Sequence, residues 1–176
     1  FADWARVQLG VRAEFAVSQA AVAGVTSGYA QPATLGVDRW LGVLAAWQRV
    51  ARPCVVVDAG SAITVDVIAA GGAHRGGYIV PGLRMMQRAL YAGTSAVRVA
   101  GEIATQLKPG TNTKAAVANG CLAMAVAVIE RARAELGGES LVILTGGDGA
   151  AIYPFVTGEC ELVAELVLDG LALALP

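Results

Sequence analysis

Apolar side chains recur at helical spacing in several parts of the chain. The clearest case is Leu35–Val50, where Trp40 and Trp47 lie seven residues apart and fall on one side of a helix. We expect both tryptophans to lie in the core. Arg52-Pro53 ends this segment. Further helices are predicted over residues 2–9, Leu83–Tyr91, Asn112 or Thr113 to about Leu136, and Leu166–Leu175.

The pattern of polar and apolar residues changes after Pro53. Short β-branched runs alternate with glycine turns, which predicts an antiparallel meander of three strands, Cys54–Asp58, Ile63–Ala69 and His74–Val80. Other strands are expected at Ala13–Val17, Leu141–Leu144 and Glu161–Val163, and a loop at Gly24–Tyr29. The mixture predicts an α/β fold. It also places a domain boundary near residue 51, between the end of a first domain (1–50) and a nearly whole second one (51–176).

Composition limits the classes of protein that the chain can represent. Its 176 residues are 56% hydrophobic and 15% charged, and the mean hydropathy of +0.59 raises the question of a membrane span. The longest apolar run, Cys121–Ile129, is much shorter than the roughly 20 residues that a spanning helix needs, so no membrane association is predicted. Thirteen basic and fourteen acidic residues, without a basic run, argue against nucleic-acid binding.

Cysteine usage and the first residues bear on location. Cys54, Cys121 and Cys160 are widely spaced and show no metal-binding spacing, so we predict reduced thiols in a cytoplasmic protein. The chain begins Phe1-Ala2, with neither an initiator methionine nor a signal-peptide pattern. We therefore expect an upstream segment in the full gene product.

The first of four short motifs with chemical potential runs from Asp58 to Asp66. It places a carboxylate, a glycine and hydroxyls at the end of a buried strand. The backbone at Gly60 and the hydroxyls of Ser61 and Thr64 suit a phosphate, and Asp58 can hold a cation beside it. The alternative is an ordinary β-turn with local hydrogen bonds from Asp and Ser.

The second motif, Thr145-Gly146-Gly147-Asp148, follows another buried strand. Its paired glycines allow a flat ring such as adenine to lie against the backbone. The alternative is a strand-to-helix turn in which Asp148 is the N-cap.

The third motif, Gly36-Val37-Asp38-Arg39, begins the Leu35–Val50 helix. Asp38 can accept a proton from a substrate hydroxyl, while Arg39 can bind a carboxylate or phosphate bidentately. Alternatively, Asp38 stabilises the helix dipole and Arg39 is solvated.

The fourth motif is the glycine-rich segment Gly76–Gly82, which joins a strand to a helix and is expected to act as a structural hinge. His74, the only histidine, is expected in a turn rather than as a catalyst. Met85 and Met86 are expected to be packing residues.

In the order of its motifs, from about Gly24 to the C-terminus, the chain resembles the type III pantothenate kinases. The order is Ser27-Gly28-Tyr29, Gly36 to Trp40, Asp58 to Asp66, Gly76 to Gly82 and Thr145 to Asp148. That family belongs to the superfamily of acetate kinases, sugar kinases and actin. The resemblance implies a ribonuclease-H-like (actin-like ATPase) α/β fold of two related domains, the first incomplete in this chain, with ATP between them.

The resemblance also implies a reaction, the phosphorylation of pantothenate by ATP as the first step towards coenzyme A. Mg2+ and a monovalent cation (K+ or NH4+) would be required. Asp38 would be the general base. The other roles would be pantothenate binding by Tyr29, Gly36, Val37, Asp38 and Arg39; ATP binding by Gly60, Ser61, Gly146 and Gly147; cation binding by Asp58; and contact of Thr113 with the pantothenate of the other subunit in a homodimer.

The chain departs from the family pattern in two places. Position 61 is Ser where the family usually has Thr, and the hydroxyl is kept. The Asp-x-Gly-Asn-Thr/Ser loop with which the family grips the outer ATP phosphates and helps to place magnesium has no match, so we expect the chain as given to be a poor kinase. Two alternatives stay open: a non-catalytic accessory or regulatory relative, and another small-molecule kinase of the superfamily, such as a sugar kinase.

Overall fold

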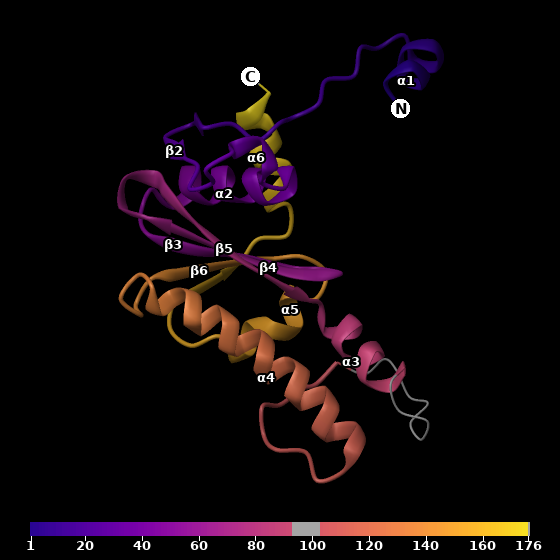
Figure 1. The fold of residues 1–176 in the computed structure, drawn as a ribbon, viewed down its shortest axis with the longest axis vertical. Coiled ribbons are helices and arrows are strands. Elements are labelled where there is room, and N and C mark those ends of the chain that lie inside the picture. The colour runs from indigo at the N-terminus through magenta and orange to yellow at the C-terminus, as the bar shows by residue number, and fades with distance from the viewer. Residues whose placement is uncertain (93–102, 176) are drawn as a thin grey trace.

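The computed structural model describes residues 1–92 and 103–175, with helices on both sides of one sheet (Figure 1). The helices are α1 (Ala2–Leu9), α2 (Val37–Val50), α3 (Leu83–Ala92), α4 (Thr113–Ala134), α5 (Gly149–Ile152) and α6 (Leu166–Ala174), with 3-10 turns at Pro32–Thr34, Ala70–Gly72 and Tyr153–Phe155. The strands are β1 (Ala21–Val22), β2 (Val25–Thr26), β3 (Cys54–Ala59), β4 (Ala62–Ala69), β5 (Ala73–Pro81), β6 (Leu141–Thr145) and β7 (Cys160–Leu162).

The seven strands form a mixed sheet in the order β1-β2-β5-β4-β3-β6-β7. β3, β4 and β5 are the predicted antiparallel meander, and β6 pairs with β3 in parallel. β3 is central and almost wholly apolar because helices cover both faces of the sheet. The α/β class, the meander and the two later strands are therefore confirmed.

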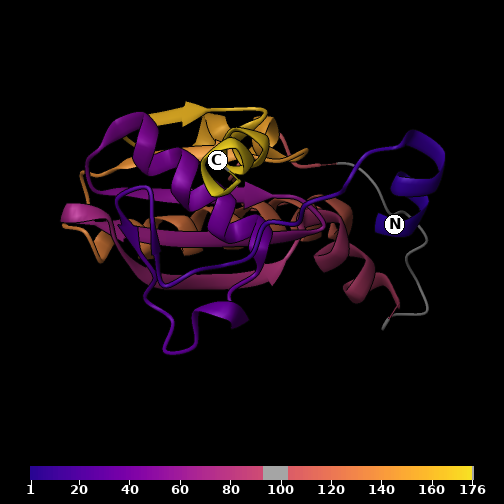
Figure 2. The same cartoon turned by 90° about the horizontal axis from the view of Figure 1, so that it is seen from above.

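α2 and α6 cover one face of the sheet (Figures 1 and 2). Trp40 and Leu44 of α2 are fully buried in a cluster with Ile68 of β4 and Ile143 of β6. Burial of each large apolar side chain contributes roughly 1.5–3 kcal/mol, so this contact fixes α2 against the sheet. The predicted helix is confirmed, although it begins two residues late, and Trp47 is only partly buried.

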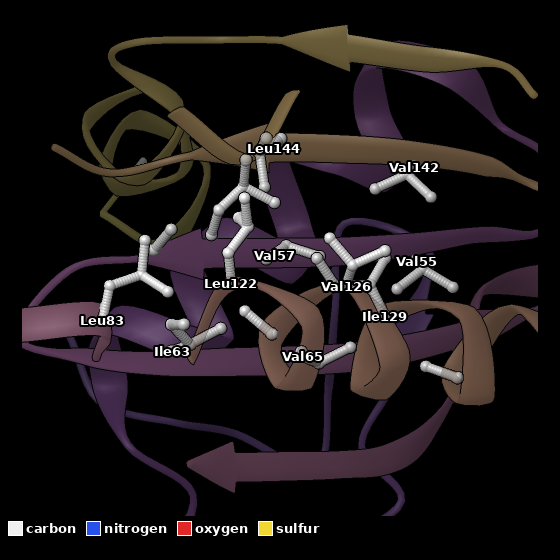
Figure 3. Close-up of a cluster of buried hydrophobic side chains, with 14 of the residues drawn as sticks. Val55, Val57, Ile63, Val65, Leu83, Leu122, Val126, Ile129, Val142 and Leu144 are labelled. Carbon is white, nitrogen blue, oxygen red and sulfur yellow. The ribbon is translucent and has the colours of Figure 1, made fainter. Parts of the chain in front are cut away.

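α4 crosses the opposite face, where the larger core cluster lies. Figure 3 shows Leu122, Val126 and Ile129 of α4 among valines of β3 and β4, with Leu83 of α3 at one end. The Asn112 side chain caps α4 by accepting a hydrogen bond from the Ala115 N–H at 2.9 Å. α4 is the one helix, within the described ranges, long and apolar enough to cross a membrane, but this is weak evidence because a core helix has the same composition.

Two expectations for the N-terminal part were wrong. Ala13–Val17 forms no strand, since no other described strand pairs with it, and Phe15 is 63% exposed. Val25 and Thr26 of the predicted loop instead form β2, which pairs with β1 in a hairpin and joins the sheet beside β5. The hairpin was missed because its strands have two residues each. Residues on both sides of position 51 thus share one sheet, while the domain boundary there stays a prediction.

Candidate active site

The face of the sheet that packs against α2 carries two carboxylates. Alternate residues of a strand point to the same face, so Asp58 shares the α2 face with Cys54 and Val56 on β3. By the same alternation, Asp66 lies on that face with Ile68 of β4. The strand period therefore brings both acidic residues towards the helix that begins Gly36-Val37-Asp38-Arg39.

Asp66 binds the guanidinium of Arg39 in a bidentate ion pair. Arg39 Nε donates to Asp66 Oδ2 at 2.9 Å and Nη2 donates to Oδ1 at 2.5 Å. The two side chains are 5% and 2% exposed. Burial alone would lower the pKa of Arg39, but the hydrogen bonds and charge of Asp66 outweigh it and raise that pKa. The sequence predicted an Arg39 open to a substrate anion, whereas its fork is bound to Asp66.

The same network holds the loop that contains Tyr29. Arg39 Nη1 donates to the Tyr29 hydroxyl at 2.8 Å, and the Tyr29 ring stacks on His74 with centroids 6.1 Å apart. His74 Nε2 lies 2.8 Å from Asp66 Oδ1, and Nδ1 accepts a long hydrogen bond of 3.5 Å from the Gly28 N–H. The neutral tautomer with its proton on Nε2 satisfies both contacts. His74 is thus a buried residue of β5 and not the expected turn residue.

Asp38 lies in the first turn of α2 and is exposed. Its Oδ1 accepts the backbone N–H of Arg39 at 2.8 Å. Asp58 is half-buried, and its pKa is raised, first by burial and then by the negative charge of Asp38. The charge of Asp38, the predicted base, therefore adds to the cost of ionising Asp58, the predicted cation ligand.

The segment after Asp58 forms a tight hairpin that meets the Gly146–Gly147 turn. Gly60 N–H donates to the Ala62 carbonyl at 2.9 Å, and the Asp148 N–H donates to the Ala59 carbonyl at 2.9 Å. Gly146 has φ +89°, and a Cβ there would collide with Asp58 Oδ1 and with the Ala59 carbonyl. Only glycine allows both the turn and the close approach. Asp148 precedes α5 but makes no side-chain cap.

A cavity of about 390 Å³ opens where these segments meet. Gly60, Ser61, Gly147 and Asp148 line it, so it gathers residues from both predicted ATP motifs. Its volume is within the range of roughly 300–1,000 Å³ that is common for small-molecule sites. Met85, expected to be a packing residue, is half exposed and lines this cavity, whereas Met86 is buried as expected.

Asp58 is the carboxylate of this site that could hold a cation. Asp58 is a half-buried carboxylate beside a second carboxylate, and both the burial and that neighbour disfavour its ionised form. A cation bound by Asp58 would relieve that penalty. No cluster of three His, Cys, Asp or Glu side chains occurs in the part of the chain that the structure describes, so we assign no step to a magnesium ion held by these residues.

Thr113 is not brought to this site within one chain. It begins α4, on the face of the sheet opposite α2 (Figure 1). There it lines a mainly apolar groove of about 710 Å³, together with Leu90, Gly120 and Met124. Its contact with the other subunit stays a prediction.

Sequence reasoning missed three residues of the site. Asp66 closes the motif that begins at Asp58 but was given no role, although the two-residue strand period would have put it on the face of α2. Arg84 and Arg88 also line the cavity, and their four-residue spacing on a helix was the available signal.

The α/β fold, the Gly-Ser hairpin and the carboxylate at a helix N-terminus are the features of a small-molecule kinase. The family model described as type III pantothenate kinase matches residues 2–135. A type III pantothenate kinase of Ectopseudomonas mendocina is 39% identical over 179 residues, covering 97% of this chain and 72% of the relative, and one of Nitrosococcus oceani is 37% identical, covering 97% and 67%. The chain belongs to the type III pantothenate kinase family.

A solved structure supports the fold. It is the crystal structure of a Campylobacter jejuni protein assigned to the Baf family of transcriptional activators. That structure matches with a TM-score of 0.60 at 25% identity, over 79% of this chain and 62% of the other.

Proposed function

We propose that this protein transfers the terminal phosphoryl group of ATP to pantothenate, giving ADP and 4′-phosphopantothenate on the way to coenzyme A. The observation that carries the proposal is the cavity lined by Gly60, Ser61 and Gly147, which joins the two glycine motifs at the end of the strand that carries Asp58. Membership of the type III pantothenate kinase family supports the choice of substrate.

Asp38 acts as the general base in this proposal. Its Oδ1 is engaged by the Arg39 N–H, whereas Oδ2 accepts no hydrogen bond from the residues that the structure describes. Oδ2 takes the proton of the pantothenate hydroxyl as that oxygen attacks the phosphorus, and the bond to ADP breaks. Such a base contributes about 10²–10⁴-fold, and positioning of the phosphoryl group supplies most of the rest.

Pantothenate lies against Tyr29 and the Gly36–Arg39 turn. Three of the five guanidinium N–H groups of Arg39 bind Asp66 and Tyr29. Arg39 therefore acts mainly by fixing Tyr29 and the backbone next to Asp38, with two N–H groups left for the substrate.

The nucleotide lies along the two glycine turns. Gly60 and Ser61 contact its phosphates, and Gly146 and Gly147 face the adenosine. Asp58 holds a monovalent cation, which supplies positive charge near the phosphates. The mixed sheet between helices supports a ribonuclease-H-like fold for the protein.

The protein acts as a cytoplasmic homodimer in this proposal. Thr113, which lines the groove beside α4, reaches the pantothenate site of the second subunit.

The experiment that tests the proposal is the formation of 4′-phosphopantothenate by the full-length gene product and by its Asp38→Asn variant, with potassium and with sodium. We expect potassium-dependent product and a loss of at least about 100-fold in the variant. Asp38 is exposed, so the variant keeps its fold and its ATP affinity. A folded wild-type protein that binds ATP but makes no product would reject the kinase function.

A second candidate is a non-catalytic accessory or regulatory function. The likeness to the Campylobacter jejuni protein assigned to the Baf family of transcriptional activators favours it. The presence of Asp38 and Asp58 opposes it, since a protein released from catalysis has no need of both carboxylates. The same assay separates the two functions.

A further inference from the structure

Two arginines of α3 face the cavity that contains the phosphate hairpin. Arg84 and Arg88 are four residues apart, so they lie on one side of the helix, and both line the cavity with Gly60, Ser61 and Gly147. Both are exposed. Neither belongs to the motifs that resemble the kinase family.

The start of α3 is fixed tightly to the hairpin. The Gly82 N–H donates to the Ser61 carbonyl at 3.0 Å, and a Cβ at Gly82 would collide with the carbonyl oxygens of Gly60 and Ser61. On the other side of the helix, Leu83 is buried in the core beside Ile63 (Figure 3). The backbone that carries the arginines is therefore held at a constant distance from the hairpin.

Local acidic groups leave much of this positive charge unpaired. Arg84 Nε is 3.8 Å from Asp148 Oδ1, which is too long for a hydrogen bond. Arg88 makes no ion pair with any residue in ranges 1–92 and 103–175. With two guanidinium groups and one carboxylate among its lining residues, the cavity carries an excess of positive charge.

We propose that Arg84 and Arg88 bind the phosphate groups of the nucleotide. This inference rests on the proposed function, which supplies ATP as the ligand, and it names the side chains that neutralise the phosphate charge. A guanidinium presents N–H groups in a planar fork that matches phosphate oxygens, and such charged hydrogen bonds are stronger than neutral ones. The hairpin supplies the Ser61 hydroxyl to the cavity, and α3 supplies the positive charge.

The test is calorimetric titration of adenosine, ADP and ATP into the wild-type protein, Arg84→Gln and Arg88→Gln. Arg131→Gln is the matched control, because Arg131 is an exposed helical arginine of α4 that does not line the cavity. We expect each cavity variant to bind ATP and ADP about tenfold more weakly or worse, with adenosine affinity unchanged. Arg131→Gln binds all three ligands as the wild type does.

The outcomes separate this inference from the proposed function. Wild-type protein that binds ATP, with cavity variants indistinguishable from Arg131→Gln, would overturn the arginine assignment and leave the kinase proposal standing. Equal losses for adenosine and ATP would also overturn it, because they point to a structural role. Absence of ATP binding by the folded wild type would overturn the nucleotide site itself. Unfolding temperatures of all variants, measured in parallel, exclude a loss of fold.

Discussion

Arg39 of α2 and Asp66 of β4 form a buried bidentate ion pair across 27 residues of sequence, with N–O distances of 2.9 and 2.5 Å. The pair ties the helix that presents Asp38 to the strand that follows the phosphate hairpin. Asp66 also accepts from His74, so one carboxylate connects α2, β4 and β5. The position of the proposed base therefore depends on a residue that touches no substrate.

Asp66→Asn is expected to destabilise the fold by about 3–5 kcal/mol, because it leaves the Arg39 guanidinium buried without a counter-charge. Urea unfolding monitored by circular dichroism measures the change. Glu135→Gln is the control: it removes an exposed pair with Arg131, and its loss costs less than about 1 kcal/mol. Equal effects of the two substitutions would contradict the assignment of a buried ion pair.

Gly146→Ala is expected to destabilise the protein by at least about 2 kcal/mol, because a left-handed backbone and a collision with Asp58 act together. Two other glycines separate these causes. The backbone at Gly138 is also left-handed, but a Cβ there would meet no neighbouring atom, so Gly138→Ala costs about 1–2 kcal/mol. Gly147→Ala has neither problem and stays within about 0.5 kcal/mol of the wild type. Thermal unfolding ranks the three variants, and a different order would reject this account of the turn.

Asp58→Asn is expected to stabilise the apoprotein in a pH-dependent manner. Burial and the charge of Asp38 raise the folded-state pKa of Asp58 above its ordinary value of 3.8, so ionisation of this carboxyl destabilises the fold. That cost is absent below the unfolded-state pKa, grows as the pH rises through the folded-state pKa, and is constant above it. The advantage of the variant should therefore be small at pH 3 and full at neutral pH.

The measurement for Asp58 is the unfolding temperature of both proteins as a function of pH in sodium buffer, then in potassium buffer. A bound potassium ion stabilises only the wild type, so potassium reduces the difference in unfolding temperature between the two proteins at neutral pH. A gap that does not depend on pH would contradict the raised pKa. A gap that is equal in both salts would contradict the cation site.

The three thiols are expected to react slowly with Ellman's reagent at pH 8. Burial raises the pKa of Cys54 to about 12 and that of Cys160 to about 11, and it also raises the pKa of Cys121. The thiolate is the reactive form, so little of it is present in the native protein. Addition of guanidinium chloride should release three rapidly reacting thiols, and fast labelling of the native protein would show that the core is open.

The sequence predicted those elements whose local pattern agrees with their environment in the fold. β3 is a continuous β-branched run because it is buried on both faces, and α4 begins at an asparagine that caps it. Prediction from the sequence failed where a strand depends on pairing partners that are distant in the chain. Ala13–Val17 has a strand-like composition but no described strand beside it, while β1 and β2 are too short for any periodicity.

The features of the candidate site also divide into those that the sequence determines and those that depend on tertiary packing. Sequence motifs alone determined the Asp58–Ser61 hairpin, the Gly146–Gly147 turn and the acidic start of α2, because glycine turns and helix N-termini depend on residues next to one another in the chain. Only the tertiary structure decided that Arg39 binds Asp66, that the charge of Asp38 reaches Asp58, and that Arg84 and Arg88 line the cavity. Ion pairs and cavities depend on distances between segments far apart in sequence, and those distances are set by how α2 and α3 pack on the sheet.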